Sequence, residues 1–210
     1  MKDVKCIFFD IGSTLVDESA AYKDRIENTI AGSSVSYNVF TEKLIQTYRE
    51  SAQRAVSFRG VCSFFGLEPS PWRSEYEFLY PETEGCLRTL SGNYKIGIIA
   101  NQDPGSEERL NKLGLLKYLD LVIASAEEDV AKPDLQIFQI ALDRANCKPE
   151  ESVMVGDRID NDIIPANKIG MTTVWIRQGY GGCAEPKTNE EQPDYTVYNL
   201  SDVAELFTRC

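Results

Sequence analysis

The 210-residue sequence predicts an α/β fold in which a mainly parallel sheet carries a helical insertion. Short apolar runs rich in β-forming residues alternate with amphipathic segments through the second half of the chain, the pattern of a parallel sheet covered by helices. Residues 17–80, by contrast, show helical spacing and no convincing strand alternation. With 42% hydrophobic residues, the chain can bury a substantial core.

The first predicted strand covers residues 6–9, an apolar run without a turn residue that is typical of a strand buried on both faces. Residues 17–80 are predicted to be helical because apolar side chains recur at helical spacing, for example through residues 44–56. This segment is therefore an insertion between the first two strands. Its aromatic residues, such as Tyr22 and Tyr48, are expected to pack the insertion rather than line a pocket.

Beyond residue 80, strands and single helices alternate, which implies right-handed crossovers between parallel strands. The predicted strands cover residues 95–100, 121–124, 153–155, 172–176 and 195–197, the last at the sheet edge. The predicted helices cover residues 81–90, 106–113, 134–145, 161–169 and 201–207.

Composition excludes several classes of function. The formal net charge of −11 argues against nucleic acid or an anionic membrane as a partner, because both require clustered Lys and Arg. The apolar run before Asp10 is too short for a signal peptide or a membrane span, so we expect a cytoplasmic protein. The sequence does not predict an oligomeric state.

The sequence contains no histidine, which excludes Ser-His and Cys-His triads and all His-ligated metal sites. Oxygen ligands remain, and they favour Mg²⁺ or Ca²⁺ over zinc. The six cysteines include no Cys-x-x-Cys pair, so most are expected to be reduced thiols.

Three strand ends and one helix start carry candidate site residues. Asp10 and Asp157 each follow a buried strand, the second one opening an acidic loop that reaches Asp162. Asn101 follows a third strand, whose exposed amides suit phosphate oxygens. Lys132 precedes a predicted helix, where a cation is unfavourable unless an anion lies nearby.

Each of these residues alone has an ordinary structural explanation, such as capping a turn or a helix. Taken together they favour a common site, because parallel sheets bind ligands at the carboxyl ends of their strands. Two carboxylates would hold a hard divalent cation there and the lysine would offset the remaining charge. The sequence thus predicts a place for a phosphoryl group.

The order of these motifs resembles that of the haloacid dehalogenase superfamily, in the subclass whose cap lies between motifs one and two. The motifs are Asp10-Ile11-Gly12-Ser13-Thr14, Ala100-Asn101, Lys132-Pro133, and Gly156 to Asp162. The resemblance spans nearly the whole chain. It implies a Rossmann-like core domain of residues 1–16 and 81–210, a helical cap domain of residues 17–80, and a small phosphorylated substrate.

The resemblance also implies roles for individual residues. Asp10 would be the nucleophile and form an aspartyl-phosphate, while Lys132 would hold the nucleophile and the phosphoryl oxygens. Asp162 would lie in the outer shell. The implied Mg²⁺ ligands are Asp10, the Gly12 carbonyl and Asp157, and the implied phosphate-binding residues are Ala100, Asn101 and Lys132. This agrees with the chemistry of a carboxylate nucleophile, which divides one displacement into two easier ones.

Two positions depart from the family pattern. Family phosphatases carry a general acid/base Asp two residues after the nucleophile, where this chain has Gly12. The usual Ser or Thr of motif two is Ala100, which removes one hydroxyl contact to phosphate. A residue such as Asp17 or Glu18, or a good leaving group, would have to compensate for Gly12.

Other functions stay open at this point. Family phosphonatases and dehalogenases also lack the second Asp, and a phosphonatase would need a Schiff-base lysine such as Lys23 or Lys43. The intact Gly156-Asp157 pair argues for a retained metal and against a dehalogenase. A catalytically weak protein that binds phosphate or a partner is the third possibility.

Overall fold

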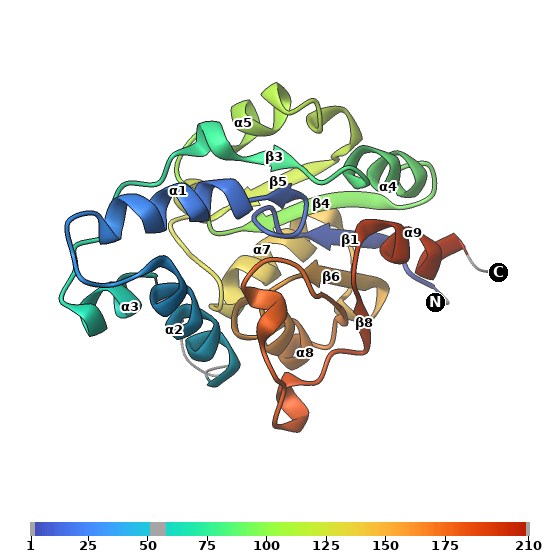
Figure 1. Ribbon diagram of the computed structural model, residues 1–210. Coiled ribbons are helices and arrows are strands. Elements are labelled where there is room, and N and C mark those ends of the chain that lie inside the picture. The colour runs from blue at the N-terminus through green and yellow to red at the C-terminus, as the bar shows by residue number, and fades with distance from the viewer. Residues whose placement is uncertain (1–2, 51–57, 209–210) are drawn as a thin grey trace.

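The computed structural model describes residues 3–50 and 58–208 (Figure 1). Its centre is a six-stranded sheet of order β5-β4-β1-β6-β7-β8, in which all neighbouring strands are parallel. The strands are β1 (Cys6–Phe9), β4 (Lys95–Ala100), β5 (Leu121–Ala124), β6 (Ser152–Gly156), β7 (Thr172–Ile176) and β8 (Tyr195–Val197). The predicted α/β fold and parallel sheet are confirmed.

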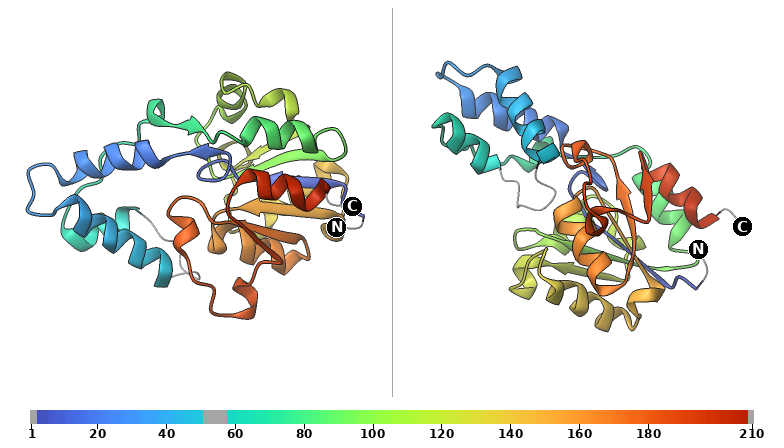
Figure 2. Two further views of the ribbon diagram at one scale, coloured as in Figure 1. Left: turned by 45° about the vertical axis from the view of Figure 1, so that its right-hand side comes forward. Right: turned by 90° about the horizontal axis from the view of Figure 1, so that it is seen from below.

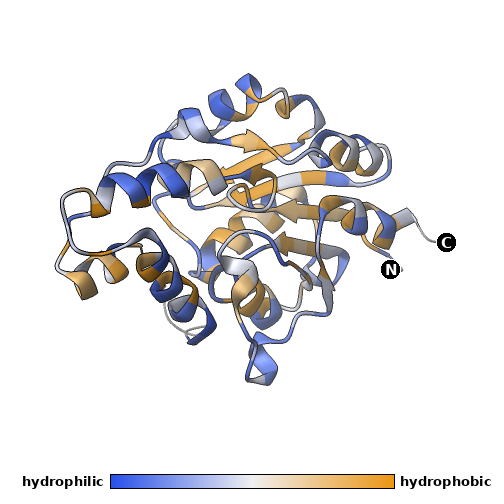
Figure 3. Ribbon diagram, in the orientation of Figure 1, coloured by the Kyte–Doolittle hydropathy of each residue, from blue (hydrophilic) through white to orange (hydrophobic). Residues whose placement is uncertain are grey.

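Both faces of the sheet are covered, as the side-chain alternation of β1 shows. Ile7 and Phe9 pack with α4 (Thr83–Leu90) and α9 (Leu200–Thr208) on one face. Cys6 and Phe8 pack on the other face with α7 (Leu135–Ala145) and α8 (Ile164–Ile169). The central strands are accordingly mainly hydrophobic, whereas the helices also carry many hydrophilic residues (Figure 3).

The insertion between β1 and β4 forms helices α1 (Ser19–Ile30), α2 (Tyr37–Glu50) and α3 (Phe58–Phe65). These helices share an apolar cluster of their own, built around Ile26, Phe40 and Leu44. Figures 1 and 2 show these helices beyond the end of the sheet to which the β1 arrow points, which is the carboxyl end of the strands. The insertion therefore lies over the carboxyl ends of the strands.

A small antiparallel sheet ties the two ends of the insertion together. Strand β2 (Val16–Asp17) leaves the core and pairs with β3 (Phe78–Leu79), where the chain returns. Sequence reasoning missed both strands, since two residues are too few to show alternation. The predicted helical run through Val56 ends outside the described residues.

Several helix boundaries differ from the prediction. Helix α7 begins at Leu135 rather than 134, because the Asp134 side chain caps it by accepting a hydrogen bond from Gln136 N at 2.9 Å. The predicted helix over 161–169 is a π-helical turn (Ile159–Ile163) followed by α8. Further short helices are α5 (Ser106–Lys112) and α6 (Ser125–Glu128) and the 3₁₀ turns Ser74–Tyr76, Leu116–Tyr118, Pro149–Glu151, Gly181–Cys183 and Asn189–Glu191.

The cysteines differ in part from the expectation of reduced thiols. Cys6 and Cys147 are joined by a disulfide between β1 and the loop that follows α7. Cys62 and Cys86 are buried thiols and Cys183 is a partly exposed thiol, whereas Cys210 lies outside the described residues. Among the described residues, no helix combines the length and the apolar composition that a bilayer span requires.

Candidate active site

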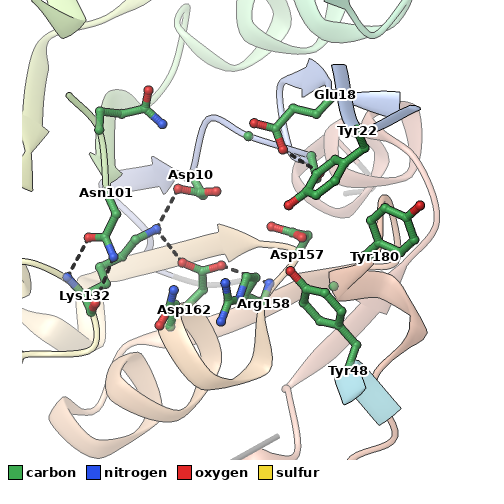
Figure 4. A pocket seen from close by; sticks show the side chains of 15 residues that line it. Asp10, Glu18, Tyr22, Tyr48, Asn101, Lys132, Asp157, Arg158, Asp162 and Tyr180 are labelled. Carbon is green, nitrogen blue, oxygen red and sulfur yellow. Dashed lines mark hydrogen bonds and ion pairs between the residues drawn. The ribbon is translucent and has the colours of Figure 1, made fainter. Parts of the chain in front are cut away.

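A cavity of about 210 Å³ opens at the carboxyl ends of β1, β4 and β6, beneath the insertion (Figure 4). The predicted residues that line it are Asp10, Gly12, Asn101, Lys132, Asp157 and Asp162. Ala100 is the exception, because it is fully buried at the end of β4 and does not line the cavity. The structure therefore brings six of the seven predicted site residues together.

Lys132 is the cationic centre of the cavity. Its Nζ donates to Asp10 Oδ1 at 2.7 Å and to Asp162 Oδ1 at 2.6 Å, and only 2% of its side chain is exposed. Burial acts against the charge, yet the Asp10 and Asp162 carboxylates outweigh it and raise the pKa of Lys132. The ammonium therefore stays charged next to Asp10.

Asn101 holds the backbone of Lys132 in place. Its Oδ1 accepts from Lys132 N at 2.7 Å and its Nδ2 donates to Lys132 O at 2.9 Å. Both polar atoms of the side-chain amide thus contact the backbone of Lys132. Its predicted contact to phosphate remains a prediction, but the structure shows a positioning contact that the sequence did not reveal.

Asp162 is held from two sides. Besides Lys132, the backbone N of Arg158 donates to its Oδ2 at 3.0 Å. Burial and the nearby Asp10 carboxylate raise the pKa of Asp162 to about 6, against the opposing effect of Lys132. A Cβ at Gly156 would lie 2.3 Å from Asp162 Oδ2, so only glycine permits this close approach.

Three carboxylates meet in the cavity, and their oxygens lie within 4.8 Å of one another. They belong to Asp10, Asp157 and Asp162. Burial, and then the Asp10 and Asp162 carboxylates, raise the pKa of Asp157 well above its usual range. Lys132 offsets one of these charges, Arg158 is already paired with Asp160, and the donor set is one of hard oxygens. The residues therefore fit a divalent cation such as Mg²⁺.

Asp10 and Asp162 differ in how many of their carboxylate oxygens the protein already contacts. Both oxygens of Asp162 accept hydrogen bonds from the protein, whereas Lys132 contacts Asp10 through Oδ1. Asp162 is therefore held through both of its oxygens and in turn fixes the Lys132 ammonium beside Asp10.

Glu18 occupies the space beside Gly12 that a side chain would fill. A Cβ built on Gly12 would lie 2.5 Å from Glu18 Oε1 and 2.9 Å from Glu18 Oε2. Ser13 Oγ donates to Glu18 Oε2 at 2.9 Å. Burial raises the pKa of Glu18 to about 7, in spite of the opposing hydrogen bond from Ser13. Asp17, the other acid considered for this place, does not line the cavity, and its Oδ1 instead accepts a hydrogen bond from Ser19 N at 2.8 Å.

Aromatic residues close the outer side of the cavity. Tyr180 follows β7 in the core, and its ring centre lies 4.9 Å from that of Tyr22 and 6.1 Å from that of Tyr48. Arg158 lies 5.6 Å from the centre of the Tyr48 ring. The expectation that Tyr22 and Tyr48 only pack the insertion was wrong, because both rings also line the cavity.

Comparison with known proteins places the chain in a family. The family model described as haloacid dehalogenase-like hydrolase matches residues 4–170. The chain belongs to this family. A glyceraldehyde 3-phosphate phosphatase of Pyrococcus furiosus is 34% identical over 230 aligned residues, which cover 100% of this chain and 95% of that protein.

Two further similarities come from other members of this hydrolase family. A phosphoserine phosphatase of Thermus thermophilus is 33% identical over 127 residues, 60% of this chain and 49% of that protein. The crystal structure of a HAD phosphatase from Thermococcus onnurineus superposes with a TM-score of 0.66 at 25% identity and covers 98% of both chains. The resemblance stated from the motifs is thus confirmed at the level of the family and the fold.

Proposed function

We propose that this chain is a Mg²⁺-dependent phosphatase of small phosphorylated metabolites that forms an aspartyl-phosphate on Asp10. The observation that carries the proposal is the contact of buried Lys132 with Asp10, with the Asp157 carboxylate in the same cluster. This arrangement combines a nucleophilic carboxylate, a fixed cation and a metal site. Residues 1–16 and 81–210 would be the core domain and residues 17–80 the cap domain of a cytoplasmic protein.

The site residues would have separate roles in attack on phosphorus, charge stabilisation and metal binding. Asp10 Oδ1 is held by Lys132, which leaves Oδ2 to attack phosphorus. The Lys132 ammonium stabilises the negative charge of the transferring phosphoryl group. Asp10, the Gly12 carbonyl and Asp157 would hold Mg²⁺, which supplies a Lewis acid for the phosphoryl oxygens.

The cavity favours a small substrate. Its volume is about 210 Å³, and aromatic rings from the insertion and from Tyr180 close it on the outer side. The similarity to a glyceraldehyde 3-phosphate phosphatase and a phosphoserine phosphatase agrees with this, because both substrates named are small phosphate monoesters.

The structure weakens the phosphonatase alternative. Lys23 is exposed on α1, and the Lys43 ammonium lies 4.5 Å from the centre of the Phe64 ring. Neither lysine lines the cavity, so neither is placed to form a Schiff base with a substrate bound at Asp10. The acidic cluster likewise favours a metal-dependent reaction over dehalogenation.

The proposal is tested with a panel of alkyl, aryl and acyl phosphates, assayed for phosphate release with Mg²⁺ and with EDTA. We expect turnover with Mg²⁺ that disappears in Asp10→Asn. Asp17→Asn is the matched control, because it makes the same chemical change outside the cavity. Turnover in Asp10→Asn equal to that of the wild type would contradict the nucleophile assignment. A Mg²⁺-induced thermal shift without turnover of any ester would favour a binding protein.

A further inference from the structure

The proposed phosphatase has no carboxylate at position 12, where its family carries the general acid/base. Without such a group an alkyl oxygen would leave as an unprotonated alkoxide, and water would attack the aspartyl-phosphate without a base. General acid/base catalysis contributes about 10² to 10⁴-fold, so its source matters for activity.

We propose that Glu18 is the general acid/base of this enzyme and takes the place of the carboxylate missing at position 12. This inference rests on the proposed phosphatase function. The three atoms nearest to a Cβ built on Gly12 are all carboxyl atoms of Glu18, at 2.5 to 2.9 Å. A carboxylate therefore lies beside position 12, although it comes from the start of the insertion.

Gly12 and Glu18 are complementary. The backbone of Gly12 is not in the positive-φ region, so a side chain at this position would meet no backbone strain. What stands in the way of one is the carboxyl group of Glu18 itself. The absence of a side chain at position 12 thus provides the room that Glu18 uses.

Glu18 also lies where a leaving group must pass. It lines the cavity that contains Asp10 and Lys132, and it lines a second cavity of about 540 Å³. The second cavity is bordered by Trp72 from the insertion and by Arg109 from the core. A phosphoryl group at Asp10 with its leaving group in the second cavity would have the ester oxygen between them, next to Glu18.

The side chain is held in this place. Ser13 Oγ donates to its Oε2 at 2.9 Å, and Glu18 stands at the N-cap of α1, directly after β2. Figure 4 shows its carboxyl group directed into the same cavity as Asp10 and Asp157. The hydrogen bond occupies Oε2 and leaves Oε1 for the substrate.

The reaction balances with Glu18 in this role. An oxygen of Asp10 bonds to phosphorus as the ester P–O bond breaks, and the Glu18 carboxyl gives its proton to the departing oxygen, which leaves as an alcohol. The Glu18 carboxylate then takes a proton from water, whose oxygen bonds to phosphorus as the bond to Asp10 breaks. Phosphate is released, and Asp10 and Glu18 return to their starting states.

The test compares Glu18→Gln with the wild type in the presence of Mg²⁺, using 4-nitrophenyl phosphate and phenyl phosphate. Nitrophenolate leaves without a proton, so Glu18→Gln should release one nitrophenolate per active site in a rapid burst. Steady turnover should then fall by about 10² to 10⁴-fold, with phosphorylated Asp10 accumulating in the intact mass spectrum. With phenyl phosphate the burst itself should be slowed. Asp17→Asn should behave like the wild type.

Moving the carboxylate from position 18 to position 12 tests whether loss of activity comes from the missing carboxylate rather than from a damaged structure. Glu18→Ala should have almost no turnover. The double variant Glu18→Ala/Gly12→Asp should turn over at least about tenfold faster than Glu18→Ala, because a carboxylate returns to the vacated space. Turnover of Glu18→Gln within threefold of the wild type on both esters, with Asp10→Asn inactive, would overturn the role of Glu18 and leave the phosphatase proposal standing. An inactive wild type, or an active Asp10→Asn, would overturn both. Failure of the swap in a folded protein would assign Glu18 a structural role.

Discussion

Replacing Glu18 by Gln should change how the stability of the metal-free protein depends on pH. Burial raises the pKa of Glu18 from its ordinary 4.5 to about 7. At about 1.4 kcal/mol per pH unit, this difference corresponds to about 3 kcal/mol. The side chain is partly exposed at the cavity, and solvent screening reduces the expected effect to about 2 kcal/mol.

The sign follows from the raised pKa. Below pH 4.5 both the folded and the unfolded chain carry the Glu18 proton, so the ionisation of Glu18 does not change the free energy of unfolding. As the pH rises toward 7, the unfolded chain releases this proton first, and the free energy of unfolding falls. Above the folded pKa the loss is complete. Glu18→Gln lacks this loss, so its stability advantage over the wild type should grow by about 2 kcal/mol across the window.

The assay is urea denaturation in EDTA at a series of pH values from about 4 to about 8, for the wild type and Glu18→Gln. Glu27→Gln on the exposed side of α1 controls for the loss of one carboxylate from the chain. A difference between wild type and Glu18→Gln that stays constant over the whole pH range would refute the reasoning, because it would show that burial does not perturb this carboxyl.

Three further outcomes follow from the same cavity. Asp157→Asn should raise the free energy of unfolding of the metal-free protein at neutral pH, because it removes a buried carboxylate whose pKa is raised. It should also abolish the thermal shift caused by Mg²⁺, and an unchanged shift would contradict the metal assignment. Lys132→Met should lower the free energy of unfolding, measured in urea at neutral pH, by about 3 to 5 kcal/mol, because both carboxylate partners lose their cation. A loss below about 1 kcal/mol would contradict the contribution of these ion pairs. Tyr180→Ala removes the core ring that contacts both insertion tyrosines, so KM in ester hydrolysis should rise more than kcat falls; an unchanged KM would argue against this ring closing the site.

The sequence was sufficient to predict the sheet and most of the site. Strands such as β1 and β4 are short apolar runs rich in β-forming residues, and the parallel sheet then brings their carboxyl ends together. Asp10 and Asp157 are each one residue beyond a strand end, and β1 and β6 are neighbours in the sheet. Their meeting therefore required only the correct strand boundaries and the parallel arrangement.

Contacts that depend on side-chain paths were not predictable in this way. Asn101 appeared as a phosphate ligand because it follows a strand, yet its amide spans the backbone of Lys132, thirty-one positions later in the chain. The rings of Tyr22 and Tyr180 meet because α1 and the loop after β7 approach each other across the cavity. No local spacing encodes such an approach, since each partner alone is an ordinary aromatic residue.

The carboxylate that is missing at position 12 of the motif is supplied in the structure by a residue from elsewhere in the chain. In the sequence, Gly12 is a missing carboxylate, and neither Asp17 nor Glu18 is distinguished from the other as its replacement. The structure distinguishes them, because Asp17 accepts a hydrogen bond from Ser19 N whereas the Glu18 carboxyl lies beside Gly12. The same glycine that removes a side chain from the motif thus admits another from the insertion. Proton transfer in this enzyme would then depend on the insertion being seated over the core, which couples substrate enclosure to chemistry.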